Sequence, residues 1–316
     1  MSRFLVLGLG FIATHVAEAL SKLGHVTVTY RSLNGINEIY AKILRGSVEL
    51  TRLNPLTDEY ELRSLIKNSD TVINLIGALS NDFQLLRAVH VTIPRQVASL
   101  IADYSPSIML IHVSASNVMG PIGKFITEEP RHCEGAKPST LYEETKCLGE
   151  QAVYSISQST GFPLAIIRPT LVYGKYNTHP QFLQIYNVAK VGIVPRVNAK
   201  LMAISAPKLT ELIIRLHELR PRSLYLYATE CEPVEVARFF EIMVKALGKR
   251  PLRIPIPNIL LKLALPSDVK PLFKYINTTY SCVRIKELVG DLRFMEDEVY
   301  ENALFIRQFK NYAIGP

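Results

Sequence analysis

A glycine-containing turn near the start of the chain constrains its fold more than any other feature. The turn reads G-L-G-F-I-A at residues 8–13 and follows an apolar run, Phe4–Leu7, that suits a buried strand. A helical pattern, Phe11–Leu23, begins inside the turn. A strand, a glycine turn and a helix in this order predict the opening unit of a parallel sheet that binds a nucleotide at its edge.

Each position of the turn has a physical role in that interpretation. Gly8 allows the tight turn, and Gly10 lets the backbone come close to a pyrophosphate. Ala13 replaces a third glycine and still permits close packing of helix on strand. The first N–H groups of the helix, at Phe11 and Ile12, are free to bind an anion, which the helix dipole also favours. The turn therefore predicts a bound dinucleotide.

Short apolar runs alternate with helical patterns as far as about residue 170. Such alternation with short links predicts an α/β fold, a doubly wound parallel sheet of the Rossmann type with right-handed crossovers. The expected strands are Phe4–Leu7, Val26–Tyr30, Val48–Leu53, Val72–Ile76, Met109–Ser114 and Leu164–Arg168. The expected helices are Phe11–Leu23, Asn37–Leu44, Glu59–Asn68, Phe83–Tyr104 and Leu141–Thr160.

The pattern changes beyond Gly174, where most of the 19 prolines lie and short segments replace the regular alternation. One further strand, Leu224–Tyr227, and one helix, Val234–Leu247, are expected there. We therefore predict a dinucleotide-binding Rossmann domain over residues 1–174. Residues 175–316 are predicted to form a smaller C-terminal substrate-binding lobe, interleaved with late strands of the sheet.

The end of the second expected strand bears on the choice of dinucleotide. A site specific for NAD usually carries an acidic residue there, which accepts hydrogen bonds from the ribose 2′-hydroxyl. This chain has Arg31 and Ser32 instead. A guanidinium and a hydroxyl suit the 2′-phosphate of NADP. NADP is therefore the preferred cofactor, and NAD stays open.

Tyr142 and Lys146 are four residues apart on an expected helix, so both lie on one face. A nearby lysine lowers the pKa of a phenol, because its charge favours the phenolate. Such a pair can move a proton to or from an alcohol while nicotinamide takes or gives a hydride. The pair follows an expected strand that ends in serines, Ser114 and Ser116.

Together these motifs resemble the extended short-chain dehydrogenase/reductase family, the NAD-dependent epimerase/dehydratase group, including its atypical members. The resemblance covers roughly residues 3–300, most convincingly 3–175. The motifs that carry it are G-L-G-F-I-A at 8–13, V-I-N-L-I-G-A at 72–78, S-A-S-N-V-M-G at 114–120, Tyr142–Lys146, and I-R-P-T-L-V-Y-G at 167–174.

The resemblance implies a role for particular residues. Tyr142 would be the general acid/base, and Lys146 would bond the nicotinamide ribose and lower the tyrosine pKa. The family also implies homodimers that form through the helices Phe83–Tyr104 and Leu141–Thr160. Further cofactor-binding positions implied are Ile76, Gly77 and Ala78, with Asn54 near adenine and Pro169 near the nicotinamide.

Several positions depart from the family pattern. The usual catalytic Ser/Thr falls on Ala115, between Ser114 and Ser116, so the sequence leaves open which serine bonds the substrate oxygen. The structural Asn of the fourth helix corresponds to His90. Ser116 and Asn117 stand where dehydratases of the group carry an Asp-Glu pair, which disfavours dehydration.

Two functions remain from the sequence. The first is an NAD(P)-dependent oxidoreductase or epimerase acting on a sugar nucleotide or a related hydroxyl or carbonyl compound. The second is a catalytically silent NADP-binding sensor or assembly subunit, because some atypical members keep the nucleotide and lose turnover. Tyr142 and Lys146 favour the first function, and the unsettled serine favours the second.

Composition limits the other possibilities. The four cysteines, which have neither CxxC spacing nor histidines at metal-ligand spacing, predict reduced thiols in a cytoplasmic protein without a metal site. No apolar run reaches the roughly 20 residues that span a bilayer, so no membrane is expected. The net charge of +8 is scattered, which disfavours nucleic-acid binding. A small-molecule substrate is the expected partner.

Overall fold

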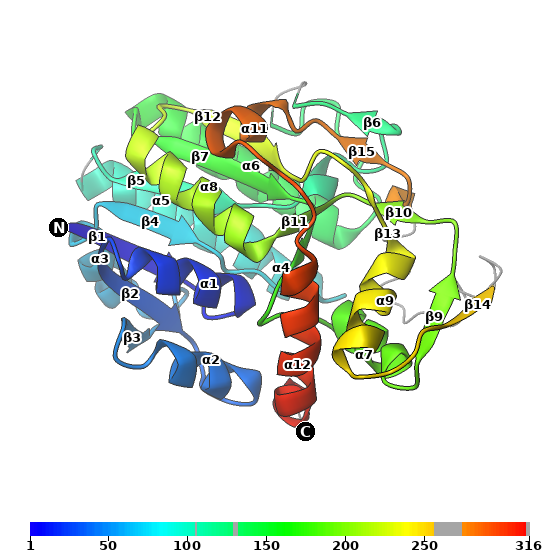
Figure 1. The fold of residues 1–316 in the computed structure, drawn as a ribbon. Helices are drawn as coiled ribbons and strands as arrows, with labels where there is room; N and C mark the ends of the chain where they lie inside the picture. Colours follow the sequence, from blue (N-terminus) through cyan, green and yellow to red (C-terminus); the bar gives the residue numbers. More distant parts are fainter. Residues whose placement is uncertain (105, 129–131, 256–273, 314–316) are drawn as a thin grey trace.

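Seven parallel strands form the central sheet of the molecule (Figure 1). The computed structural model describes residues 1–104, 106–128, 132–255 and 274–313. The strand order is β12-β7-β5-β4-β1-β2-β3, and each pair of neighbours is parallel. The strands are β1 (Ser2–Leu7), β2 (Gly24–Tyr30), β3 (Glu49–Arg52), β4 (Thr71–Asn74), β5 (Met109–Val113), β7 (Leu164–Pro169) and β12 (Leu224–Ala228).

The chain begins in the middle of the sheet, winds outward through β2 and β3, and returns through β4 to the other side. The doubly wound parallel sheet expected from the sequence is therefore confirmed. The expected strands differ from the observed ones only at their ends. The run Val72–Ile76, for example, leaves the sheet after Asn74, which accepts a hydrogen bond from the N–H of Ile76 at 3.2 Å.

Helices cover both faces of the sheet, as its nearly continuous apolar strands require. The helices α1 (Phe11–Leu20), α8 (Ala206–Leu219) and α11 (Val283–Val289) share one apolar cluster with the sheet. The helices α3 (Glu59–Lys67), α5 (Ile93–Tyr104) and α6 (Leu141–Thr160) share the other. Successive residues of β5 alternate between the two clusters, because side chains along a strand point to opposite faces.

The helical stretch expected over residues 83–104 contains a π-helical turn. It consists of α4 (Phe83–Arg87), the π turn Ala88–Thr92 and α5. Asp82 caps α4 by accepting hydrogen bonds from the N–H groups of Gln84 and Leu85. The π turn packs against α6, which the sequence pattern did not indicate.

A smaller lobe lies beside the sheet, at the right in Figure 1. Its apolar cluster joins α7 (Pro180–Ala189), α9 (Val236–Ala246) and α12 (Glu296–Ala313). Helix α12 also packs against α2 (Ile36–Leu44), beside the sheet. The remaining elements are β6 (Phe125–Ile126), β8 (Leu171–Tyr173), β9 (Ile193–Arg196), β10 (Lys200–Leu201), β11 (Ala203–Ser205), β13 (Val234–Glu235), β14 (Leu252–Pro255) and β15 (Thr279–Tyr280).

The prediction of reduced cysteines is wrong in this structure. Cys133 and Cys147 form a disulfide with a Cα–Cα distance of 5.8 Å, and Cys231 and Cys282 form a second with 5.3 Å. Both distances lie within the range that a disulfide spans. The pairs are 14 and 51 residues apart in the sequence, so only the fold brings them together.

Candidate active site

The sequence-predicted site residues gather at one edge of the sheet, where the parallel strands have their carboxyl ends. Gly8 follows β1, Gly77 follows β4 and Ser114 follows β5. β1 and β4 are neighbours, and the chain reverses its direction of winding between them. In open α/β sheets such a reversal leaves a crevice in which ligands bind.

The glycine turn has the geometry that an anion site needs. Gly8 has a φ of +97°, and a Cβ atom on it would lie 3.1 Å from the side chain of Ile76. The N–H of Gly8 donates to Thr29 Oγ1 at 3.1 Å, which fixes the turn. A Cβ atom on Gly10 would meet nothing within 4 Å, so the space at the start of α1 is open.

The start of α1 has neither a capping side chain nor an acidic residue in its first turn. The N–H groups at Phe11 and Ile12 are therefore left for a ligand, and no carboxylate repels an anion there. Residues beyond the second strand lie at the same edge. Arg31 is exposed, and the hydroxyl of Ser32 donates to Asn34 Oδ1 at 3.3 Å.

A second arginine lies beside this position, which the sequence analysis missed. Arg52 ends β3 and is the register partner of Tyr30, the last residue of β2. The paired ends of β2 and β3 thus bring Arg31 and Arg52 to the same corner of the central sheet. Asn54 follows β3 closely, and its backbone N–H donates to Asp58 at 2.8 Å. Only the pairing of β2 with β3 reveals this second cation.

Lys146 is held between the end of β5 and the loop after β4. Its ammonium group donates to the carbonyl oxygen of Val113 at 3.3 Å and lies 3.7 Å from where a Cβ atom of Gly77 would be. The side chain is 5% exposed. Burial lowers the pKa of Lys146 to about 8, against the opposing effect of Glu150. The lysine therefore stays charged at neutral pH, at the edge where the glycine turn lies.

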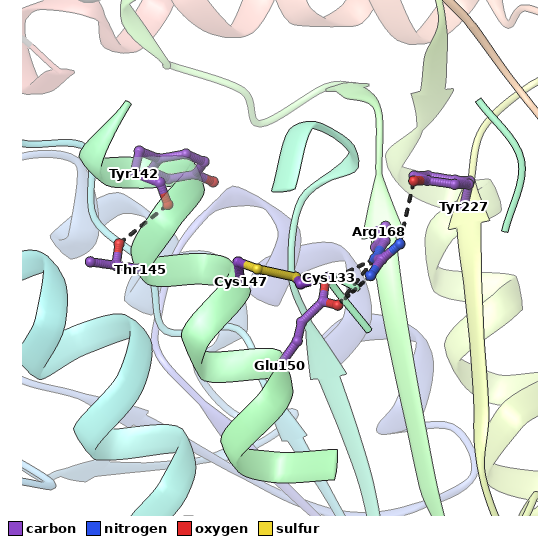
Figure 2. Close-up of a disulfide and its surroundings, with 7 residues drawn as sticks. All are labelled: Cys133, Tyr142, Thr145, Cys147, Glu150, Arg168 and Tyr227. Carbon is purple, nitrogen blue, oxygen red and sulfur yellow. Dashed lines mark hydrogen bonds and ion pairs between the residues drawn. A yellow bond between two sulfur atoms is a disulfide. The ribbon is translucent and has the colours of Figure 1, made fainter. Parts of the chain in front are cut away.

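Tyr142 lies in the first turn of α6 (Figure 2), and Lys146 is four residues further along the same helix. The side chain of Thr140 caps this helix by accepting a hydrogen bond from the N–H of Glu143 at 3.2 Å. Burial raises the pKa of Tyr142 to about 12, and the charge of Glu143 adds to the shift. The sequence predicted a pKa lowered by Lys146, but in the structure the pKa of Tyr142 is raised.

The two serines have different surroundings. Ser114 is 4% exposed, and its buried hydroxyl oxygen has no hydrogen-bond partner among the described residues. Ser116 begins a 3-10 turn, Ser116–Met119, and its hydroxyl offsets part of the rise that burial causes in the pKa of Tyr280, a residue of β15. Ser116 therefore lies toward β15, and Ser114 is buried at the end of β5.

Glu143 is a buried carboxylate that the sequence analysis did not single out. It accepts hydrogen bonds from the Tyr275 hydroxyl at 2.6 Å and from Asn117 Nδ2 at 3.3 Å. Its other oxygen accepts from the N–H and hydroxyl of Ser139, at 2.6 and 2.9 Å. The residue beside Tyr142 therefore joins two distant segments, at Asn117 and Tyr275, to the start of α6. A charged residue next to the Y-x-x-x-K tyrosine was the only available signal.

A buried ion pair lies one turn beyond Lys146. Glu150 accepts hydrogen bonds from Arg168 of β7, and Arg168 also donates to the hydroxyl of Tyr227 at 3.3 Å (Figure 2). Pro169 follows Arg168 and pairs with Ala228 of β12, so it also lies at the carboxyl edge. The pair fixes α6 on the sheet in the position that Lys146 requires.

Within the described residues, no three His, Cys, Asp or Glu side chains come together in a way that would hold a metal ion. No helix in the same part of the chain combines the length and hydrophobicity needed to cross a membrane.

The model of the NAD dependent epimerase/dehydratase family matches residues 4–190. No curated protein matches the chain in sequence. The solved UDP-glucuronic acid 4-epimerase from Bacillus cereus in complex with NAD has a TM-score of 0.78 at 17% identity, covering 97% of this chain and 96% of its own. WbmH of Bordetella bronchiseptica in complex with NAD⁺ has 0.75 at 14% identity, covering 98% and 99%. A UDP-galactose 4-epimerase has 0.68 at 18%, covering 97% and 99%.

At these identities the solved structures establish the fold alone. The family match is independent of them and spans 4–190 of 316 residues, which is more than half of the chain. It includes the glycine turn, the loop after β4, the tyrosine–lysine pair and the Arg-Pro strand. These are the motifs on which the resemblance to the family rested.

Proposed function

Because this chain belongs to the NAD dependent epimerase/dehydratase family, we propose that it epimerises or reduces a sugar nucleotide or a related hydroxyl or carbonyl compound. The observation that carries the proposal is the position of Lys146. Its ammonium group lies between Val113 and Gly77, at the sheet edge where the glycine turn also lies. A lysine with only a structural role would gain nothing from having its charge buried at the edge of the sheet where ligands bind.

The residues at the sheet edge fit a dinucleotide. Gly8, Gly10 and the free N–H groups of Phe11 and Ile12 would hold the pyrophosphate. Ile76, Gly77, Ala78 and Pro169 would line the nicotinamide side, and Asn54 the adenine side. The bound nicotinamide supplies the chemistry of taking and giving a hydride. The substrate would lie against the second lobe, residues 175–316.

Tyr142 would move the proton. Its raised pKa keeps the phenol protonated at neutral pH, so it can donate a proton to a carbonyl oxygen that becomes an alcohol. In the reverse direction the positive charge of Lys146 favours the phenolate that accepts the proton. Ser114 and Ser116 are both candidates for the contact with the substrate oxygen, since the buried hydroxyl of Ser114 has no hydrogen-bond partner among the described residues.

We further propose that the protein prefers NADP. Arg31 and Arg52 bring two cations to the strand ends where an acidic residue would select NAD, and Ser32 adds a hydroxyl. The UDP-glucuronic acid 4-epimerase and WbmH structures compared above contain NAD, so the preference proposed here distinguishes this chain from them.

A homodimer through α5 and α6 is part of the same proposal. The outer face of α6 carries Leu141 and Leu148, each 40% exposed, and Leu85 of α4 is 37% exposed nearby. Light scattering should give the mass of two chains, and Leu148→Glu should give one. Leu252→Glu changes a leucine that is 61% exposed in the smaller lobe, so it serves as the control that leaves the mass unchanged.

The test of the proposed function is Tyr142→Phe. Loss of a positioned acid/base group should lower turnover about a hundredfold or more and leave the Kd for dinucleotide unchanged. Tyr60→Phe is the matched control, because Tyr60 lies on α3 and is 83% exposed. Equal turnover by the Tyr142→Phe variant and the unchanged protein would overturn the mechanism.

The second candidate is a silent dinucleotide-binding subunit, and Ala115 favours it. This residue occupies the position of the family's catalytic Ser/Thr and packs in the apolar cluster beside Tyr142. A protein that binds NADPH and turns over nothing in a screen of sugar nucleotides and carbonyl compounds would support this candidate.

A further inference from the structure

The π turn in the helix over residues 83–104 places a histidine inside the site. His90 lies at the centre of the turn Ala88–Thr92 and is 1% exposed. π turns are rare, and they are frequent at functional sites because they shift one residue out of the helical register. The proposed mechanism gives this buried imidazole no role.

Both ring nitrogens of His90 have partners, and the partners fix its tautomer. The backbone N–H of Ala78 can only donate, so Nε2 of His90 accepts this bond at 3.2 Å. Nδ1 therefore carries the proton and donates to Thr145 Oγ1 at 3.0 Å. The Thr145 hydroxyl in turn donates to the carbonyl oxygen of Leu141 at 2.8 Å. One run of hydrogen bonds thus joins the loop after β4 to the residue before Tyr142.

The ring of His90 also contacts Tyr142 directly. The two ring centroids are 5.2 Å apart, and the rings are nearly perpendicular, at 88°. This is the edge-to-face arrangement that aromatic rings prefer. The imidazole therefore has three fixed contacts, at the dinucleotide-side loop, at the hydroxyl of Thr145 and at the proposed acid/base itself.

Gly149 shows that the close approach of the two helices is required. A Cβ atom at this position of α6 would overlap the carbonyl oxygen of His90. Only glycine lets α6 come this close to the π turn. Because Gly149 is one turn beyond Thr145, two successive turns of α6 contact His90, through its ring and through its backbone.

The imidazole is neutral in this environment. Burial lowers the pKa of His90 to about 3, and the charge of Lys146 adds to the shift. Nε2 therefore stays an acceptor for the N–H of Ala78 throughout the neutral range. A protonated ring would lose this bond.

We propose that His90 is a positioning residue that holds the dinucleotide-side loop at Ala78 and the first turn of α6 at a fixed separation. Ala78 is next to Gly77, against which Lys146 lies, so the separation sets how Lys146 and Tyr142 face a bound nicotinamide. The turnover part of this inference rests on the proposed function, and the binding part does not.

Two substitutions test the two hydrogen bonds of the His90 ring separately. His90→Asn keeps a donor near the position of Nδ1, for Thr145, and loses the acceptor for Ala78. His90→Gln keeps an acceptor near the position of Nε2, for Ala78, and loses the donor for Thr145. We expect His90→Asn to raise the Kd for NADPH about tenfold, and His90→Gln to lower kcat about tenfold with an unchanged Kd, since one hydrogen bond has about this net worth.

Substitutions of Thr145, the partner of His90 Nδ1, give a second test should the His90 variants fold poorly. Thr145→Val removes the hydroxyl, and we expect it to lower kcat as His90→Gln does. Thr145→Ser keeps the hydroxyl, and we expect it to retain the original kcat. The double variant His90→Gln/Thr145→Val should be no slower than Thr145→Val alone, because both changes remove the same bond.

His217 provides a matched control. Its Nδ1 bonds to Thr71 Oγ1 at 2.7 Å, so it forms the same kind of His–Thr pair. Thr71 begins β4, at the opposite edge of the sheet from the site. His217→Gln and His217→Asn should lower Tm and leave both kcat and Kd unchanged.

NADPH binding is measured by the fluorescence of its reduced nicotinamide. A Kd for His90→Asn equal to that of His90→Gln would overturn the inference, as would variants that change only Tm. Wild-type protein without turnover would overturn the proposed function, while the two Kd values would still decide on His90.

Discussion

Glu150 accepts hydrogen bonds from Nε and Nη2 of Arg168, at 3.1 and 2.6 Å, in an ion pair whose side chains are 0% and 1% exposed. Burial raises the pKa of the Glu150 carboxyl, but the charge and hydrogen bonds of Arg168 lower it by a larger amount. The net pKa is therefore below its usual value. Glu150→Gln would leave the guanidinium buried without its counter-charge. We expect a loss of about 3–5 kcal/mol in the free energy of unfolding, measured in urea.

The exposed pair Arg215–Glu218 gives the control for this substitution. Both of its side chains are about half exposed, and Glu218→Gln should change the free energy of unfolding by less than about 0.5 kcal/mol. The pH dependence has a defined sign. The folded pKa of Glu150 lies below the unfolded value, so its contribution is present above the unfolded pKa and is lost as the pH falls through the folded pKa. Equal effects of the two substitutions would contradict the role given to Glu150.

Glu230 predicts a pH effect of the opposite sign. Burial raises the pKa of Glu230 to about 7, although the Tyr173 hydroxyl and the N–H of Ser205 both donate to it. The folded state therefore holds this proton more tightly than the unfolded state. As the pH rises from about 4.5 to 7 the protein should lose up to about 3 kcal/mol, at about 1.4 kcal/mol per pKa unit.

Glu230→Gln mimics the protonated carboxyl and isolates this effect. Other titrating groups contribute equally to the variant and the unchanged protein, so the difference between their Tm values reports Glu230. We expect the variant to gain Tm relative to the wild type as the pH rises from 5 to 8. Tm curves that stay parallel over this range would show that Glu230 titrates normally.

Arg31 should determine the preference for NADP. Arg31→Ala removes the cation at the end of β2, and we expect the KM for NADPH to rise about tenfold or more while the KM for NADH stays unchanged, since one charge-assisted hydrogen bond is worth about 1.5–3 kcal/mol. Arg63→Ala on α3 removes an exposed arginine at a distance from the site and controls for net charge. A proportional rise in both KM values would rule out a contact with the 2′-phosphate.

The disulfides predict the state of the thiols. Denatured, unreduced protein should show no thiol that reacts with Ellman's reagent, and reduction should expose four. Reduction should also lower the free energy of unfolding, by about 3–4 kcal/mol per bridge from the lengths of the closed loops. Cys133→Ser should release one reactive thiol, at Cys147. Four reactive thiols before reduction would instead support the prediction that all four cysteines are reduced.

The regular parts of the molecule could be predicted from sequence because their signals are local. The glycine turn at residues 8–13 and the apolar run at Val72–Ile76 each indicate their structure within a few residues. Spacing alone also placed Tyr142 and Lys146 on one helical turn.

The contacts that complete the site could not be predicted, because they join segments distant in the sequence. A π turn leaves the apolar pattern around His90 almost unchanged, so the sequence indicated an unbroken helix. Arg52 joins Arg31 only through strand pairing. The cysteine pairs depend on how loops and helices pack, and their spacing gave no sign of it.

The hydrogen bond between Tyr275 and Glu143 spans 132 residues, which orders events during synthesis. The glycine turn and the strands around it leave the ribosome long before Tyr275 does. The residues of the proposed dinucleotide crevice are thus available to fold before Glu143, beside Tyr142, can gain its full set of partners. On the proposed function, a nascent chain could hold a dinucleotide before the start of α6 is complete.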